Sequence, residues 1–300
     1  MTSRRHFLTA GLGAAAPCLA VNRIGRARLS AITDEIANSP AGAIEFARLY
    51  RLGWLELRGV PGARGKSYAA MSEGELRAAA RELSEHGVKV SFLNSSLLKH
   101  MLPGTQPASP RHHQDDARVR FEGRLDALRR ALEAAHIFGV NKIRTFTFSR
   151  VNDPLSLLPR LADILGEMAE ISGRENVYLL IENEASCNIA TCAEMAGLLH
   201  LLPSKWIEIN WDPLNGTRFQ EAPFPDGYAK LPRERIGNVQ IKGKSVLPYP
   251  ERLDWGAIFA ALARDAYRGQ CGLETHIFDE RLIEHSHAAM KVLLEIVGEA

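Results

Sequence analysis

The sequence predicts one α/β domain, a single (β/α)8 TIM barrel over residues 23–300. Short β-prone runs alternate with amphipathic helical segments throughout that range. The run 177–181 has no polar break, which is typical of a strand buried on both faces of a parallel sheet. Four of the later strands end in a polar or ionisable side chain. Barrels of this class build their active sites from such strand ends at one rim.

Each expected element is bounded by turn residues or by caps. The strands are expected at 28–36, 54–60, 89–94, 142–148, 177–184, 206–212, 238–242 and 272–276. Ser39 and Pro40 begin the first helix, while Gly87 and Gly139 end two later ones. The helices are expected at 39–53, 71–86, 121–138, 155–173, 190–202, 253–267 and 280–297, with an irregular stretch at 216–235. Eight strands alternating with seven or eight helices indicate one barrel without a second domain.

Residues 95 to about 118 form a long polar connection that contains three prolines. A loop of this length inside a compact domain is usually functional. We expect it to lie over the C-terminal rim of the barrel and to act as a lid.

Residues 1–22 differ from the rest of the chain and resemble an export signal. Arg4 and Arg5 are followed by Phe7 and Leu8, and then by small and apolar residues. The paired arginines are typical of a twin-arginine signal, which would direct the protein to the periplasm. A frayed basic tail is the alternative interpretation. The twin-arginine route carries folded proteins, many of them loaded with a cofactor.

Composition narrows the classes of partner. The formal net charge of +2 gives no electrostatic case for nucleic acid or for an anionic membrane surface. No apolar run is long enough to span a bilayer, so no membrane anchor is expected. Cys187, Cys192 and Cys271 do not make a disulfide scaffold, and we expect all three to be structural.

Four consecutive strand ends carry the candidate site. Glu182, Asp212, Gln240 and Glu274 are separated by 30, 28 and 34 residues, about one strand–helix unit each. Three carboxylates in one pocket repel one another, and a divalent cation relieves that repulsion. Oxygen-rich ligation favours Mg²⁺ or Mn²⁺ over Zn²⁺. The alternative is that these acids cap helices or pair with arginines.

Six segments carry a family resemblance in their order and spacing: Thr33–Ile36, Leu55–Arg58, Leu180–Asn183, Asn210–Asn215, Val239–Lys242 and Gly272–Thr275. On these segments the sequence resembles the xylose isomerase-like barrel superfamily of sugar phosphate isomerases and epimerases. The resemblance covers nearly the whole of residues 23–300. It implies one divalent metal, Mn²⁺ first and otherwise Mg²⁺, Co²⁺ or Zn²⁺, held by Glu182, Asp212, Gln240 and Glu274. The family commonly has His where this chain has Gln240, and Gln is a weaker, neutral oxygen ligand.

The resemblance also implies a chemistry. The metal would coordinate the carbonyl and an adjacent hydroxyl of a ketose or keto-sugar. Proton transfer would then pass through an enediolate. Glu182 and Glu274 would remove and return the carbon-bound proton. Epimerisation, isomerisation and elimination all remain open. An exported enzyme would act on a free or oxidised sugar, such as a 3-keto-glycoside, and family members often form homo-oligomers.

Further residues have weaker roles in this hypothesis. Lys242 would steady the enediolate or a substrate oxygen, or would simply pair with Asp212. Glu56 shares the inward face of its strand with Arg58. It would contact a substrate hydroxyl, or it would pair with Arg58 or with neighbouring strands. Trp211 would stack on a sugar or pack in the core, and His276 would add an imidazole near Glu274.

Two other classes compete with the isomerase or epimerase. A DNA repair endonuclease of the same superfamily needs several histidine ligands and a basic DNA-binding face. This sequence has no histidine at the ends of its first seven expected strands, a net charge of only +2 and an expected export signal. A non-catalytic carbohydrate-binding barrel is supported by Gln240, and a keto-glycoside lyase could use the same site.

Overall fold

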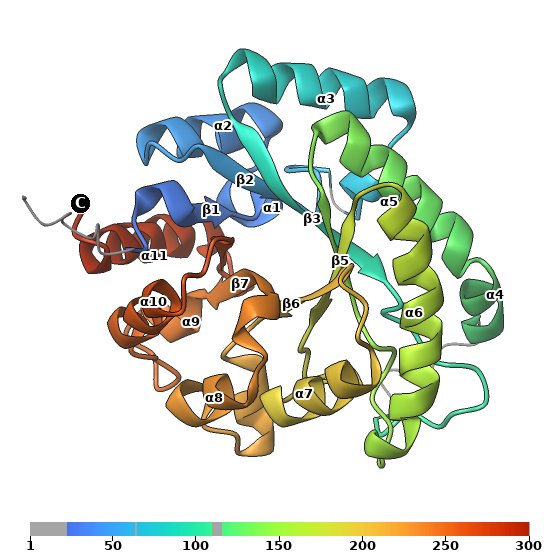
Figure 1. Ribbon diagram of the computed structural model, residues 1–300. Helices are drawn as coiled ribbons and strands as arrows, with labels where there is room; N and C mark the ends of the chain where they lie inside the picture. The colour runs from blue at the N-terminus through green and yellow to red at the C-terminus, as the bar shows by residue number, and fades with distance from the viewer. Residues whose placement is uncertain (1–22, 64, 110–115, 300) are drawn as a thin grey trace, which may run out of the picture.

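The computed structural model describes residues 23–63, 65–109 and 116–299. Its centre is one sheet of eight parallel strands in the order β1-β8-β7-β6-β5-β4-β3-β2. A parallel bridge between Ile32 and Glu56 joins the two ends of that order, so the sheet closes into a barrel (Figure 1). The strands are β1 Leu29–Ala31, β2 Trp54–Leu57, β3 Lys89–Leu97, β4 Lys142–Thr145, β5 Tyr178–Glu182, β6 Ile207–Trp211, β7 Ile236–Lys242 and β8 Gln270–Glu274. The predicted (β/α)8 fold is confirmed.

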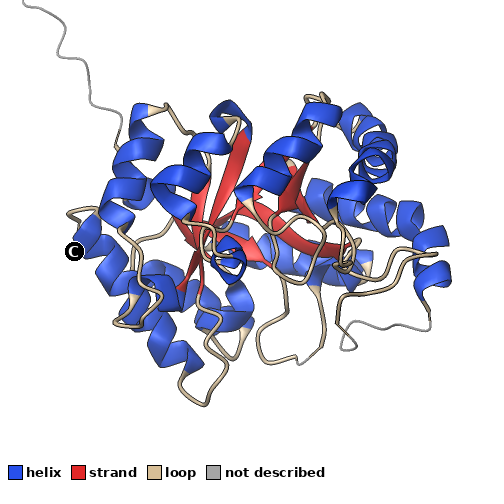
Figure 2. Ribbon diagram, turned by 90° about the horizontal axis from the view of Figure 1, so that it is seen from below, coloured by secondary structure: helices blue, strands red, loops and turns tan. Residues whose placement is uncertain are grey.

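Helices surround the barrel, as Figure 2 shows. They are α1 Thr33–Ile36, α2 Pro40–Leu49, α3 Glu73–Glu85, α4 Ala117–Glu122, α5 Arg124–Phe138, α6 Leu158–Arg174, α7 Cys192–Leu201, α8 Tyr228–Lys230, α9 Gly243–Val246, α10 Trp255–Arg264 and α11 Leu282–Ile296. Side-chain caps begin several of them. Ser39 accepts from the backbone of Gly42, and Thr191 forms a capping box with Glu194.

The structure corrects three expected elements. The first strand ends at Ala31, and Thr33–Ile36 is a helical turn instead. The third strand continues past residue 94 to Leu97. The helix expected at 121–138 is two helices, α4 and α5, which meet at Gly123. The stretch 216–235 is irregular as predicted, with short helical turns and α8.

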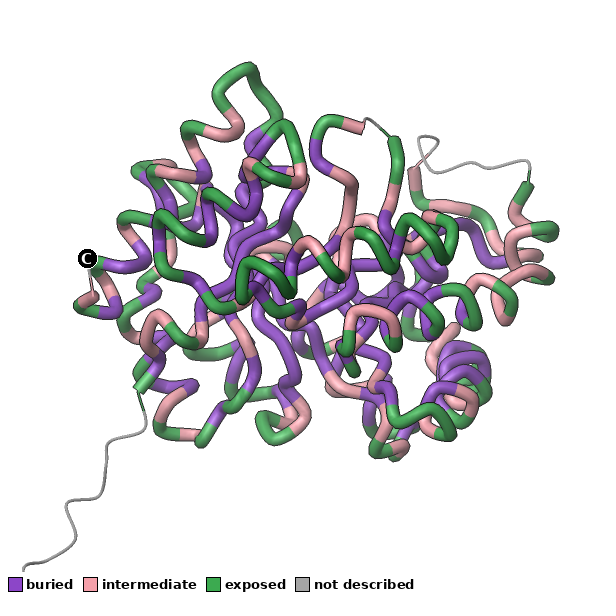
Figure 3. Tube along the Cα trace, turned by 90° about the horizontal axis from the view of Figure 1, so that it is seen from above, coloured by how far each residue is buried: buried purple, intermediate pink, exposed green. Residues whose placement is uncertain are grey.

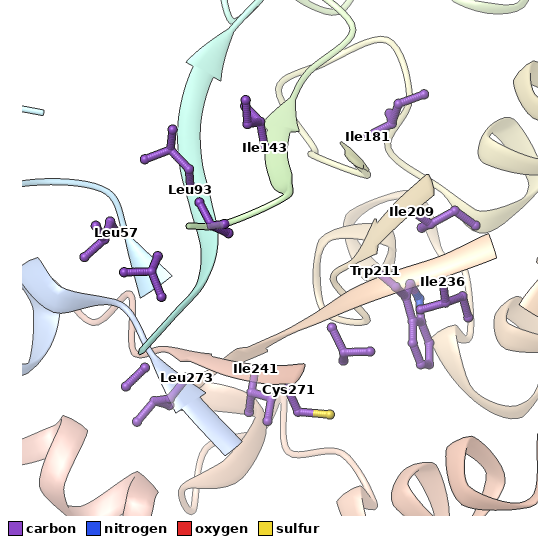
Figure 4. Packing of buried hydrophobic residues seen from close by; sticks show 14 of the residues in the cluster. Leu57, Leu93, Ile143, Ile181, Ile209, Trp211, Ile236, Ile241, Cys271 and Leu273 are labelled. Atoms are coloured by element: carbon purple, nitrogen blue, oxygen red, sulfur yellow. The ribbon is translucent and has the colours of Figure 1, made fainter. Parts of the chain in front are cut away.

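The two faces of each strand separate apolar from polar side chains. Residues on the outer face, such as Leu57, Ile181, Ile209 and Leu273, pack in the core beneath the helices (Figure 4). The inner face carries polar side chains that are also buried, among them Glu56, Asn94, Asn210, Asn238 and Gln240. The barrel is accordingly buried along its strands while the helix surfaces are exposed (Figure 3). Packing fixes the outside of the barrel, and hydrogen bonding fixes its inside.

Two predictions fall partly or wholly outside the described residues. The export signal at 1–22 lies there, as does the part of the expected lid at 110–115. Among the helices of the described part, none is long and apolar enough to cross a membrane. Cys187, Cys192 and Cys271 are free and buried, as expected of structural cysteines.

Candidate metal centre

Three carboxylates from three strands meet at the C-terminal rim of the barrel. Glu182 ends β5, Asp212 follows β6, and Glu274 ends β8. One oxygen from each lies within 4.8 Å of the others. All three side chains are buried. We call these three residues the acidic cluster.

Cationic side chains surround the acidic cluster. Lys242 Nζ lies 2.7 Å from Oε2 of Glu274 and 3.3 Å from Oδ2 of Asp212. Arg144 donates to Oε2 of Glu182 at 3.0 Å, and Arg58 donates to Oε1 of Glu274 at 2.8 Å. Both oxygens of Glu274 are therefore engaged by cations. Oε1 of Glu182 accepts no hydrogen bond from the described residues.

These neighbours change the pKa values in opposite directions. Burial raises the pKa of Asp212 to about 7, although Lys242 opposes the shift. Burial alone would also raise the pKa of Glu274, but Lys242, His276 and Arg58 together hold it well below its usual range. The pKa of Lys242 is raised: burial opposes this, while Glu274 and Asp212 favour the ammonium form. The site therefore holds Glu274 ionised, while the pKa of Asp212 lies near neutral pH.

Gln240 lies at the fourth predicted position, on the inner face of β7. Trp211 pairs with Val239, so Asp212 and Gln240 follow as neighbours on adjacent strands. The amide nitrogen of Gln240 donates to Oε2 of Glu56 at 2.7 Å. Among the described residues, neither Oε1 of Gln240 nor Oδ2 of Asp212 accepts a hydrogen bond, and both atoms are buried. Asp212 and Gln240, on adjacent strands, thus each have one buried oxygen that accepts no hydrogen bond from the described residues.

Glu56 points into the barrel as predicted, but it does not reach the rim. Its carboxylate is fully buried and receives hydrogen bonds from Ser30, Asn94, Asn238 and Gln240. A carboxylate with four protein donors has no free position for a substrate hydroxyl. The predicted substrate contact of Glu56 is therefore wrong, and the alternative of pairing with neighbouring strands is correct.

Trp211 also lies away from the site. Side chains alternate along β6, so Asn210 and Asp212 face inward while Trp211 faces the helix layer. Its ring is fully buried in the hydrophobic core (Figure 4). The ring centroid lies 5.1 Å from that of Tyr228. The predicted stacking on a sugar is wrong, and the packing alternative is correct.

His276 does lie beside the acidic cluster. Its Nδ1 is 3.5 Å from Oε1 of Glu274 and 3.8 Å from Oε1 of Glu35, and its backbone amide donates to Glu35. Burial alone would lower its pKa, but Glu274 and Glu35 raise it to about 9. The side chain is 48% exposed, so it borders solvent at the rim.

Glu35 is the site residue that the sequence reasoning missed. It lies in α1, is fully buried, and forms an ion pair of 2.7 Å with Arg58. Glu35, Glu274 and His276 form a second group whose ligand atoms lie within 4.8 Å of one another. The signal was present in the sequence, since two adjacent acids follow the first strand. Because a strand was expected over the whole of 28–36, the turn of α1 that directs Glu35 toward the mouth of the barrel was not anticipated.

The residues at the acidic cluster fit a divalent cation. They offer three carboxylates and one neutral amide oxygen, a donor set that hard cations prefer. The two oxygens of Asp212 and Gln240 without hydrogen-bond donors support this fit. An unsatisfied buried polar atom costs free energy, and a cation would satisfy both.

The sequence matches the model of one protein family. The model of the xylose isomerase-like TIM barrel family matches residues 46–293. No curated protein matches the sequence.

Solved structures with low sequence identity share the fold. The apo 3-keto-D-glucoside 4-epimerase YcjR of E. coli has 16% identity and a TM-score of 0.67, over 90% of this chain and 98% of that one. The IolI protein with bound zinc has 13% identity and a TM-score of 0.70, over 91% and 98%. A xylose isomerase-like TIM barrel protein of Mycobacterium smegmatis in complex with magnesium has 14% identity and a TM-score of 0.64, over 92% and 100%. The chain belongs to the xylose isomerase-like TIM barrel family.

Proposed function

We propose that this protein is a metal-dependent isomerase or epimerase of a ketose or keto-sugar. The observation that carries the proposal is the acidic cluster, three buried carboxylates whose oxygens lie within 4.8 Å of one another at the barrel rim. Lys242, Arg58 and Arg144 already offset part of the repulsion within the cluster, and a bound divalent cation would offset more of it. The similarity to a 3-keto-D-glucoside epimerase supports a sugar as substrate.

Glu182, Asp212, Gln240 and Glu274 would hold the metal. Mn²⁺ is our first choice and Mg²⁺ our second, while Co²⁺ and Zn²⁺ remain alternatives, since relatives are described with magnesium and with zinc. When bound, a divalent cation polarises the carbonyl of the substrate and counters the charge that develops on its oxygen.

The chain's own groups would move the proton. Oε1 of Glu182 is free of hydrogen bonds from the described residues, so Glu182 is the better placed base for a proton on carbon. Glu274 would return a proton only after it has itself been protonated and Lys242 or Arg58 has released one of its oxygens, because these cations hold it ionised. Lys242 lies beside both acids as an ammonium and would stabilise negative charge on a substrate oxygen.

The substrate class follows from the predicted export. We propose a free or oxidised sugar handled in the periplasm, because phosphorylated intermediates stay in the cytoplasm. A keto-glycoside lyase would use the same proton abstraction followed by loss of a leaving group. A carbohydrate-binding barrel without turnover, and a homo-oligomer, are compatible with the same site.

The test is metal analysis joined to a substrate panel. We expect purified protein to bind about one equivalent of Mn²⁺ or Mg²⁺ and to interconvert one member of a ketose and keto-glycoside panel, read by NMR. The double variant Glu182→Gln, Glu274→Gln should lose both metal and turnover. Glu208→Gln makes the same chemical change near the opposite end of the barrel, where burial raises the pKa of Glu208, and should keep both.

Three results separate the alternatives. Metal binding with loss of a leaving group would indicate the lyase. Sugar binding without metal and without turnover would indicate the binding protein. Absence of any metal after soaking in Mn²⁺ would overturn the metal-dependent proposal.

A further inference from the structure

The inner face of the barrel holds a hydrogen-bond network directly beside the acidic cluster. Glu56 is at its centre, and its two oxygens divide four donors between them. Ser30 and Asn238 donate to Oε1 at 3.0 and 3.3 Å, while Asn94 and Gln240 donate to Oε2 at 2.8 and 2.7 Å. The carboxylate is fully buried. A buried acid with this many donors is fixed in place.

The chain is built to admit Glu56 at this position. Gly272, on β8, lies against its carboxylate, and a Cβ at Gly272 would collide with Oε1. The glycine therefore makes room for the acid. Asn238 also donates to Asn210, which donates to Glu182, so the network reaches the acidic cluster.

The contact with Glu56 determines which way the Gln240 amide is turned. Its nitrogen donates to Oε2, and reversal of the amide would place two acceptor oxygens against each other at the same 2.7 Å. The amide oxygen is therefore turned away from Glu56. That oxygen is buried and accepts no hydrogen bond from the described residues.

The second oxygen without a donor is on the adjacent strand. Asp212 follows Trp211, which pairs with Val239, so Asp212 and Gln240 are neighbours on the inner face. Oδ1 of Asp212 accepts from the backbone amides of Leu214 and Asn215, while Oδ2 has no hydrogen bond and only the longer ion pair with Lys242. A cation bound between these two residues would satisfy both oxygens, in addition to the ion pair that Lys242 forms with Oδ2 of Asp212.

We propose that Glu56 is a positioning residue that turns the Gln240 oxygen toward the acidic cluster and so makes Gln240 a competent metal ligand. The inference rests on the proposed metal centre and deepens it. In many metal sites a carboxylate that does not touch the metal hydrogen-bonds to a histidine ligand and orients it. Glu56 would do the same for the Gln240 amide. The ligand set then consists of oxygens alone, which selects Mn²⁺ or Mg²⁺ over Zn²⁺.

The test measures metal affinity rather than turnover. Dissociation constants for Mn²⁺ and Zn²⁺ are measured by calorimetry on the whole protein and on three variants. Glu56→Gln and Gln240→Leu should each weaken Mn²⁺ binding about 10- to 100-fold. Glu208→Gln, the matched carboxylate-to-amide control, should bind as the unchanged protein does. Melting temperatures in EDTA show whether each variant is folded.

A second experiment changes the ligand atom at position 240 and measures which metal the protein prefers. Gln240→His should shift the preference toward Zn²⁺ and change the visible spectrum of bound Co²⁺, because a nitrogen replaces an oxygen. Adding Glu56→Gln should weaken that shift, since a neutral amide oxygen replaces the charged carboxylate acceptor of the imidazole. If Glu56→Gln does not fold, Gly272→Ala displaces the same carboxylate without altering it and should weaken Mn²⁺ binding in the same way.

The outcomes are distinguishable. Unchanged Mn²⁺ affinity in folded Glu56→Gln, with binding lost in Gln240→Leu, overturns the positioning role and leaves the metal centre intact. Unchanged affinity in both variants removes Gln240 from the ligand set and overturns the inference. No Mn²⁺ or Mg²⁺ binding by the unchanged protein overturns the metal centre and the inference together.

Discussion

Lys242 is a buried cation shared by two carboxylates of the acidic cluster. It is buried and contacts Glu274 and Asp212, so its removal leaves two buried carboxylates with less compensation. Losing one partner of a buried ion pair costs about 3–5 kcal/mol. We expect Lys242→Met to lose about that much unfolding free energy in EDTA.

Added Mn²⁺ should recover much of this loss, because the metal replaces the missing positive charge. Urea unfolding with and without Mn²⁺ measures both quantities. A loss of equal size in the two conditions would mean that the lysine and the metal do not share the acidic cluster. Lys244→Met is the control, because Lys244 is half-exposed and forms only a 4.0 Å ion pair with Glu251 and a 5.7 Å contact with the ring of Tyr249.

Gly272 and Glu56 form a second pair at the residue scale. A Cβ at Gly272 would collide with the carboxylate, so Gly272→Ala should cost about 1–3 kcal/mol by overpacking. In a Glu56→Ala background the same substitution should cost much less, since the colliding group is gone. A double-mutant cycle of unfolding free energies measures the coupling. Additive costs would show that the glycine is needed for another reason.

At the scale of elements, α7 depends on its first turn. Glu194 accepts from the backbone amides of Ala190 and Thr191 and pairs with Arg150 at 2.6 Å. Burial alone would raise the pKa of Glu194, but Arg150 and the two amides lower it. A carboxylate whose pKa is lowered in the folded state stabilises the protein when the pH is above the ordinary pKa of the group. That contribution is lost as the pH falls through the lowered, folded-state pKa.

Glu194→Gln should therefore destabilise the protein at pH 7 by about 1–2 kcal/mol, the range of a lost cap and charged hydrogen bond. The difference from the unchanged protein should shrink as the pH falls below about 4.5, where the glutamate also becomes neutral. Chemical denaturation across pH 3–8 provides the measurement. A difference that is constant with pH would assign the effect to packing.

The elements also show what the sequence could predict. The run 177–181 and its polar end predicted β5 and the position of Glu182, because periodicity and a terminal carboxylate are local signals. The ends of β6 and β8 followed in the same way. Alternation alone also placed Glu56 on the inner face.

The rest depended on tertiary contacts. Local sequence could not show that Glu56 is below the rim, since its depth depends on Asn94, Asn238 and Gln240 from other strands. Trp211 suits a sugar-binding site and a core equally well by residue type, and only the register of β6 places it outward. Glu35 was misjudged because the strand ends at Ala31, five residues before the expected end at residue 36, and the chain then turns into α1.

At the scale of the whole molecule, the buried site and the predicted export route constrain each other. Residues of β5, β6, β7 and β8 must be assembled before Glu182, Asp212, Gln240 and Glu274 can bind one metal. A protein exported in the folded state would acquire its metal beforehand, in the cytoplasm. The pairing of a twin-arginine signal with a metal site made from four strands is therefore physically coherent.

Replacing both Arg4 and Arg5 by lysine tests that route, because lysine keeps the charge and removes the residue type that the twin-arginine receptor reads. We expect the Arg4→Lys, Arg5→Lys protein to remain in the cytoplasm with residues 1–22 uncleaved, while the unchanged chain reaches the periplasm without them. Cell fractionation with intact-mass measurement distinguishes the two forms. Cleavage and export of the lysine variant at the normal rate would assign the leader to the route for unfolded chains. The metal would then have to bind after export.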